Sequence, residues 1–193
     1  MKAFFLAVSA ICFLSCHTTR NIHYAEKAKQ NQQAFWQNLN NLCGKTFAGE
    51  VVAAPANDTT FKNKSLVMHV RSCTDNTIRV PFMVGDDRSR TWVFTQHGNL
   101  LQLKHDHRHR DGSEDSITQY GGMATNTGLA NLQVFPADQF TTELLPAAAT
   151  NVWWVELVEG KYFTYNLRRM GSDRYFSVRF DLSTEIETAP APW

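Results

Sequence analysis

The sequence carries almost no excess of either charge. It has 193 residues, with 19 Lys and Arg against 18 Asp and Glu, which leaves a formal net charge of +1. A protein that binds nucleic acid through its phosphates needs a basic surface, and no basic stripe is present to form one. We therefore expect no nucleic-acid partner.

The signatures of several enzyme classes are also missing. The chain has neither a P-loop nor a Gly-rich dinucleotide-binding fingerprint. Ser89 lacks the G-x-S-x-G surroundings of a nucleophilic serine, and neither Cys43 nor Cys73 has a His nearby in sequence to activate it. These absences favour a binding or structural protein over an enzyme.

No apolar run is long enough to cross a bilayer as a helix. The most apolar stretch, from Ala3 to Leu14, has a dozen residues, whereas a spanning helix needs about 20. Together with the positive start at Lys2, this stretch matches the apolar core of a secretory signal peptide. We expect residues 1–15 to be the cleaved leader of an exported protein.

The leader ends in Leu14-Ser15-Cys16, which resembles the bacterial lipobox. The resemblance implies that Cys16 is lipidated and anchors the chain in a membrane, with an ordinary secretory cleavage as the alternative. His17 stands where an Asp retains many lipoproteins at the inner membrane. The sequence therefore favours the outer membrane, facing the periplasm, with residues 16–23 as a tether.

Only two of the four cysteines lie beyond the leader region, Cys43 and Cys73. In an oxidising compartment, such an isolated pair is a disulfide candidate. Closing a loop of about 30 residues would stabilise the fold by about 3–4 kcal/mol in the chain-entropy model. We expect the disulfide, and two separate buried thiols are the alternative.

Residues 24–43 are expected to form a helix. They contain neither Gly nor Pro, and apolar residues recur at Ala34, Phe35, Leu39 and Leu42, close to the helical period. The helix should end before Gly44.

Beyond residue 44 the apolar period changes from helical to two. Alternating runs occupy residues 66–71, 78–84, 92–94, 101–103, 153–157, 163–167 and 176–182. Gly- and Asp-rich turns separate about nine or ten such strands, with a short helix between Asp138 and Pro146. The pattern predicts a mainly β domain over residues 44–186, a single antiparallel up-and-down barrel with a β-sandwich as the alternative. Residues 187–193 read as a loose, Pro-rich tail.

Two resemblances accompany this pattern. The helix leading into Leu42-Cys43-Gly44-Lys45-Thr46-Phe47-Ala48-Gly49 resembles the start of calycin barrels, the lipocalins and their relatives, which implies a calycin-like fold. The chain also resembles a bacterial family of exported proteins with no known activity. The stretches that carry this second resemblance are Arg79–Trp92, Leu103–Asp115, Tyr120–Gly122, Thr150–Glu156 and Phe163–Asp181.

The stretch from Leu101 to His109 is the most unusual. On a strand alternate residues share a face, so His105, His107 and His109 should follow Leu101 and Leu103 toward the interior. Imidazoles two residues apart on a strand lie about 7 Å apart and can share a metal such as zinc. We expect no cofactor and a polar barrel end here, with zinc or haem held by the three histidines as the alternative.

Other residues on the same predicted face extend the candidate site. The candidate ligand-binding residues are His105, His107, Trp92, Arg90, Tyr120 and Trp153. A barrel of this size can enclose a small ligand. Arg168 and Arg169, near the end of a strand, are candidates either to pair with an acid such as Asp181 or to meet an anionic head group.

Three functions follow from these observations. The leading hypothesis is an envelope lipoprotein that binds a small apolar or anionic ligand in its barrel. The second is a metal-binding protein or metal-dependent enzyme that uses the His-rich hairpin. The third is a structural or interaction protein of the envelope.

Overall fold

The computed structural model describes residue 26 and residues 30–193, so the leader, Cys16 and the tether lie outside the described residues. A helix at residues 30–40 precedes the sheet. The strands are β1 (Thr46–Ala53), β2 (Leu66–His69), β3 (Ser72–Cys73), β4 (Thr77–Val84), β5 (Asp87–His97), β6 (Leu100–His107), β7 (Tyr120–Met123), β8 (Leu132–Pro136), β9 (Asn151–Val158), β10 (Tyr162–Arg169) and β11 (Tyr175–Asp181). The α-helix α2 (Gln139–Leu144) and the 3-10 helix η1 (Pro146–Ala148) lie between β8 and β9.

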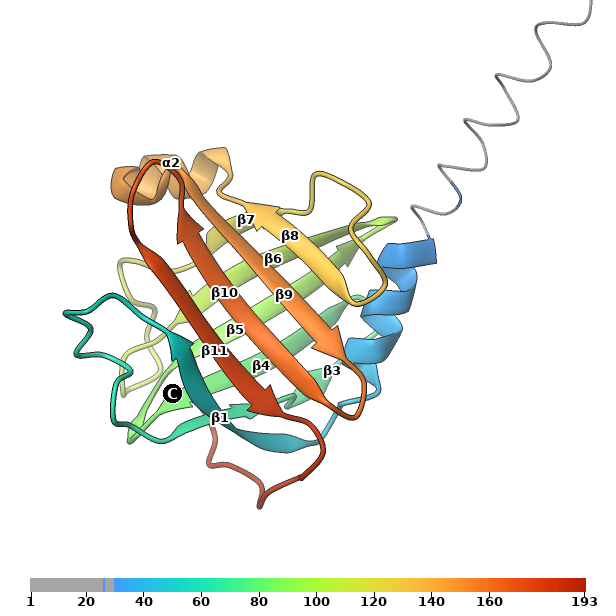
Figure 1. Ribbon diagram of the computed structural model, residues 1–193, viewed down its shortest axis with the longest axis horizontal. Helices are drawn as coiled ribbons and strands as arrows, with labels where there is room; N and C mark the ends of the chain where they lie inside the picture. The colour runs from blue at the N-terminus through green and yellow to red at the C-terminus, as the bar shows by residue number, and fades with distance from the viewer. Residues whose placement is uncertain (1–25, 27–29) are drawn as a thin grey trace, which may run out of the picture.

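The strands form one up-and-down antiparallel sheet that curls into a nearly closed barrel. Their order is β7-β6-β5-β4-β2-β1-β11-β10-β9-β8, with β3 paired only to β4. Pairing of β1 with β11 joins the strands β1 to β7 to the strands β8 to β11. Figure 1 shows β9, β10 and β11 crossing in front of β4, β5 and β6. The mainly β prediction is confirmed. The sheet has 11 strands, against the nine or ten that the sequence predicts. The two-residue β3 is too short to leave an alternating pattern in the sequence.

Alternate residues of the strands fill the interior, as the period of two predicts. In β9 the burial of successive residues alternates without a break, and Trp153, Val155 and Leu157 are buried. The helix at residues 30–40 closes one end of the barrel with Phe35 and Leu39, at the right of the sheet in Figure 1. It ends at residue 40, short of the predicted residue 43, because a tight turn occupies residues 41–44. No helix within the described residues combines the length and apolarity needed to cross a membrane.

Pro81 marks the place where β4 changes partners. Its neighbour Phe82 pairs with β2, and Arg79 pairs with β3. Proline has no N–H to donate to a ladder, so it is tolerated at this break between β2 and β3. The register of β4 against β5 shifts just beyond Pro81, between Phe82 and Val84.

Two further contacts hold the end of the N-terminal helix and the C-terminal tail against the barrel. Cys43, just after the helix, is bonded to Cys73 on β3, which confirms the predicted disulfide. The tail at residues 187–193 lies against the barrel and is not loose, because Arg88 Nη1 donates to Ala191 O at 3.0 Å and Trp193 N–H donates to Arg88 O at 3.2 Å.

The seam of the barrel lies between β7 and β8, which are neighbours in sequence but do not pair. Thr141 of α2 joins the two sides, because its hydroxyl donates to Gly121 O at 2.7 Å and accepts from Gly121 N–H at 2.7 Å. Asp138 is the N-cap of α2, where it accepts from Thr141 N–H, and it also forms an ion pair with Lys104 on β6. A Cβ on Gly122 would lie 1.8 Å from Pro136 O, so the seam closes only around a glycine.

We predict that Gly122→Ala lowers the free energy of unfolding by about 3 kcal/mol, because the added methyl overpacks the seam and forces β7 away from Pro136. Urea denaturation followed by tryptophan fluorescence measures the loss. Gly160→Ala is the matched control: no atom lies within 4 Å of its Cβ, so it incurs only the left-handed backbone strain of about 1–2 kcal/mol. Equal losses in the two variants would contradict the seam's dependence on Gly122.

Candidate functional site

A cavity of about 360 Å³ lies at the end of the barrel away from the N-terminal helix. Side chains of β4, β5, β6, β7, β9, β10 and β11 form its wall, and the loop at residues 55–61 covers one side of its mouth. All six candidate ligand-binding residues line this single cavity, namely Arg90, Trp92, His105, His107, Tyr120 and Trp153. They lie on four strands, and the inward alternation of each strand brings them together.

His105 lies deepest among the polar wall residues, and both of its ring nitrogens have protein partners. Its Nδ1 is 2.9 Å from the carbonyl oxygen of Tyr120, which can only accept, so Nδ1 carries the proton. Its Nε2, 2.7 Å from the Tyr165 hydroxyl, therefore accepts a hydrogen bond from that phenol. The imidazole is held in one tautomer and one orientation.

His107 and Tyr120 form a second pair nearer the mouth. The Tyr120 hydroxyl lies 3.0 Å from His107 Nε2, and its ring stacks on His105 with ring centroids 4.5 Å apart. Pairing of β6 with β7 places His105 directly opposite Tyr120. Each imidazole is thus hydrogen-bonded to one phenol within the wall, His105 to Tyr165 and His107 to Tyr120.

These four groups are electrically neutral at physiological pH. Burial lowers the pKa of His105 to about 3, and burial followed by the charge of Arg90 lowers the pKa of His107. Burial raises the pKa of Tyr120 to about 12, while the charges of Arg90 and Arg174 act in the opposite direction. Burial also raises the pKa of Tyr165. The inner wall therefore presents polar but uncharged groups.

Flat aromatic rings make up much of the remaining wall. Phe82, Trp92 and Tyr165 are stacked, with centroid distances of 4.7 Å and 4.5 Å along the series. Trp153 packs against His105 with ring centroids 5.1 Å apart. Because these rings already stack on one another, a ligand meets only the part of their surface that remains at the cavity, where an aromatic partner can pack in offset or edge-to-face contact.

The loop that covers the mouth is held by Asp58 and Phe61. The Asp58 carboxylate accepts from the backbone N–H groups of Phe61 and Lys62, each at 3.0 Å. The Phe61 ring lies 4.2 Å from that of Phe176, and the guanidinium of Arg90 lies 5.7 Å from its centroid. This loop has no periodic apolar pattern, so the sequence did not indicate that it contributes to the site.

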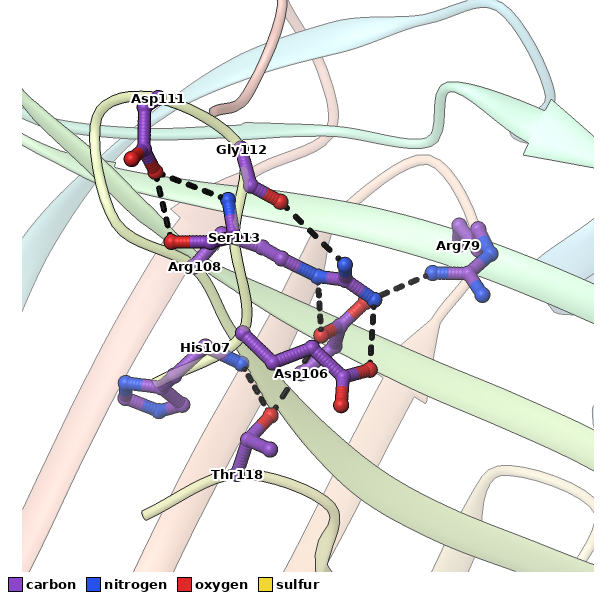
Figure 2. A network of polar contacts seen from close by, with 9 residues as sticks. Arg79, Asp106, His107, Arg108, Asp111, Gly112, Ser113 and Thr118 are labelled. Atoms are coloured by element: carbon purple, nitrogen blue, oxygen red, sulfur yellow. Dashed lines mark hydrogen bonds and ion pairs between the residues drawn. The ribbon is translucent and has the colours of Figure 1, made fainter. Parts of the chain in front are cut away.

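An outer network positions the strand that carries the histidines. Asp106 points to the outside of the barrel, where it accepts from Arg79 Nη1 at 3.0 Å and from Arg108 Nε at 2.9 Å (Figure 2). The backbone N–H of His107 donates to the Thr118 hydroxyl at 2.8 Å, which ties β6 to the chain that leads into β7. These contacts fix the turn between the strands, and so they set where the imidazoles and the Tyr120 phenol meet.

The structure separates His109 from the other two histidines. The strand β6 ends at His107, and His109 is exposed in the following turn, outside the cavity wall. Among residues 30–193, no three His, Cys, Asp or Glu side chains gather closely enough to hold a metal ion. A metal at His105 Nε2 would also have to displace the Tyr165 hydroxyl.

Two arginines of the cavity lie outside the six candidate ligand-binding residues, although the sequence names Arg169, with Arg168, as a candidate to meet an anionic group. Arg169 on β10 shares the inward face of Tyr165 and Leu167, and its Nε donates to Asn151 Oδ1 at 3.0 Å. The alternation along β10 decides between the two arginines that the sequence left open, because Arg169 faces inward and Arg168 is exposed. Arg174 reaches the cavity from the turn before β11, where no periodicity applies.

We predict that His105 makes folding sensitive to acid. Between its unfolded pKa of 6.5 and its folded pKa of about 3, the unfolded chain binds a proton that the folded chain excludes. The stability from neutral His105 is therefore fully present above pH 6.5 and declines as the pH falls, by about 2 kcal/mol at pH 5.

Urea denaturation of His105→Gln between pH 7 and pH 5 tests the contribution of His105, since glutamine can form hydrogen bonds but does not titrate. The free energy of unfolding should then fall much less between pH 7 and pH 5, and the difference should be most of the ~2 kcal/mol assigned to His105. The fall that remains comes from His69 and His107, whose pKa values burial also lowers. His97→Gln, at an exposed histidine, should leave the decline unchanged. An undiminished decline in His105→Gln would show that this imidazole is not the buried neutral group described.

No protein-family model matches the chain. No curated protein matches its sequence at a significant level.

Proposed function

We propose that this protein is an exported, lipid-anchored barrel that binds a small molecule in its cavity and does not catalyse a reaction. The observation that carries the proposal is the cavity itself, about 360 Å³ in volume, with its wall of aromatic rings and a few convergent polar groups. Ligand sites commonly have volumes of about 300–1,000 Å³ and this mixture of surfaces. The up-and-down strand order supports a calycin-like barrel.

The hydrogen bonding and the protonation state of the polar groups favour binding over catalysis. His105, Tyr120 and Tyr165 are joined by hydrogen bonds, and burial shifts their pKa values away from neutral pH in the directions that keep them uncharged. A general acid or base works best with a pKa near the operating pH. The same groups suit a fixed, uncharged wall against which a ligand rests.

The proposal of an exported, lipid-anchored protein depends on the leader and on the cysteines. The sequence Leu14-Ser15-Cys16 supports lipidation, and the disulfide between Cys43 and Cys73 supports an oxidising compartment such as the periplasm. His17 after the lipidated cysteine favours the outer membrane over the inner membrane.

Filling the cavity should abolish binding. We predict that the uncharged dye Nile red binds the wild-type protein saturably, and that Leu167→Trp weakens binding at least tenfold because the indole occupies space that Leu167 leaves open. Fluorescence titration measures the affinity. Leu100→Trp, at an exposed position outside the cavity wall, should bind as the wild type does. Absence of saturable binding, or equal binding by both variants, would overturn the proposal.

Anchoring should depend on one cysteine. We predict that Cys16→Ala abolishes incorporation of radiolabelled palmitate in a bacterial host and shifts the protein from the membrane to the soluble fraction. Cys12→Ala, four residues earlier in the leader, is the matched control and should still be labelled. Labelling that persists in Cys16→Ala would contradict the lipid anchor.

A further inference from the structure

The positive charges on the cavity wall outnumber the negative charges that the described residues place beside them. Arg90, Arg169 and Arg174 line the cavity, and Arg90 alone has a carboxylate partner, the ion pair with Asp87. Among the described residues, neither Arg169 nor Arg174 forms an ion pair with an acidic side chain. Two guanidinium groups at the cavity therefore have no carboxylate partner among the described residues, Arg169 on the wall and Arg174 exposed at the mouth.

One acidic side chain of the described residues lines the cavity, and it forms no ion pair with Arg169 or Arg174. Asp58 belongs to the loop that covers the mouth, and its carboxylate is occupied by the backbone N–H groups of Phe61 and Lys62. The histidines do not change this balance, since burial keeps His105 and His107 uncharged by lowering their pKa values. The charged side chains of the wall, with the partner of Arg90 included, leave one net positive charge.

We propose that the cavity selects a planar aromatic monoanion, with its ring system in the aromatic-lined cavity and its carboxylate at Arg169 and Arg174. This inference rests on the proposed function and names the class of ligand. The Nε of Arg169 is bound by Asn151, which leaves its two terminal NH₂ groups to meet a carboxylate. Guanidinium groups bind carboxylates through paired hydrogen bonds, which fixes orientation as well as charge.

The order of residues along the strands sets the direction of the ligand. On β10, Tyr165 and Leu167 precede Arg169 on the same inward face, and Arg174 precedes Phe176 where β11 begins. Both arginines thus flank the turn between β10 and β11, while Tyr165, stacked on Trp92, lies deeper. The carboxylate stays at the mouth, and the ring enters the barrel.

Isothermal titration of three matched probes tests the inference: 2-naphthoate, the uncharged 2-naphthamide and the cationic 2-naphthylmethylammonium. They share one ring system and differ in the charge of one group. We expect 2-naphthoate to bind at least tenfold more tightly than the amide, and the cation to bind most weakly. High salt should narrow the preference, because the arginines lie at the solvent-facing mouth.

Variants locate the charge. Arg169→Gln and Arg174→Gln should each reduce the preference for naphthoate over naphthamide at least threefold, and Arg168→Gln, on the exposed face of the same strand, should leave it unchanged. Equal affinities for naphthoate and naphthamide would overturn the anion assignment while leaving a ligand-binding barrel. Failure of every probe, together with failure of Nile red, would remove the proposed function itself. A preference that survives in both variants would also overturn the assignment, because the anion would then be recognised elsewhere.

Discussion

The hydrogen bond that Tyr165 donates to His105 Nε2 joins β10 to β6 across the interior of the barrel. His105 is carried by β6 and Tyr165 by β10, and the bond is 2.7 Å long. An unpaired imidazole or phenol at this depth would cost about 1–3 kcal/mol. Because each group satisfies the other, the barrel can leave polar side chains at one end without filling that end with apolar ones.

This pairing determines how charge is distributed around the cavity. The buried imidazoles and phenols remain uncharged, so the lasting charges are those of the arginines nearer the mouth. At the opposite end, Phe35 and Leu39 of the N-terminal helix close the barrel with apolar side chains. The molecule thus has one sealed apolar end and one end with a neutral aromatic interior and a basic rim.

The alternating pattern of the sequence predicted much of this architecture. It placed His105, His107, Trp92 and Trp153 on inward faces, and the structure brings all four to one cavity. It failed where alternation stops: His109 lies beyond the end of β6, and Arg174 and the loop over the mouth belong to turns. The position of a turn residue depends on long-range contacts such as that between Phe61 and Phe176, which no local period encodes.

The protonation state of His105 tests the central claim, the uncharged interior, most directly. Nitrogen-15 NMR of the imidazole between pH 5 and pH 8 should show one unchanging neutral ring with its proton on Nδ1, because burial lowers the pKa of His105 to about 3 and Tyr120 O accepts from Nδ1. A His105 ring that titrates near its ordinary pKa of 6.5, or carries its proton on Nε2, would contradict the account.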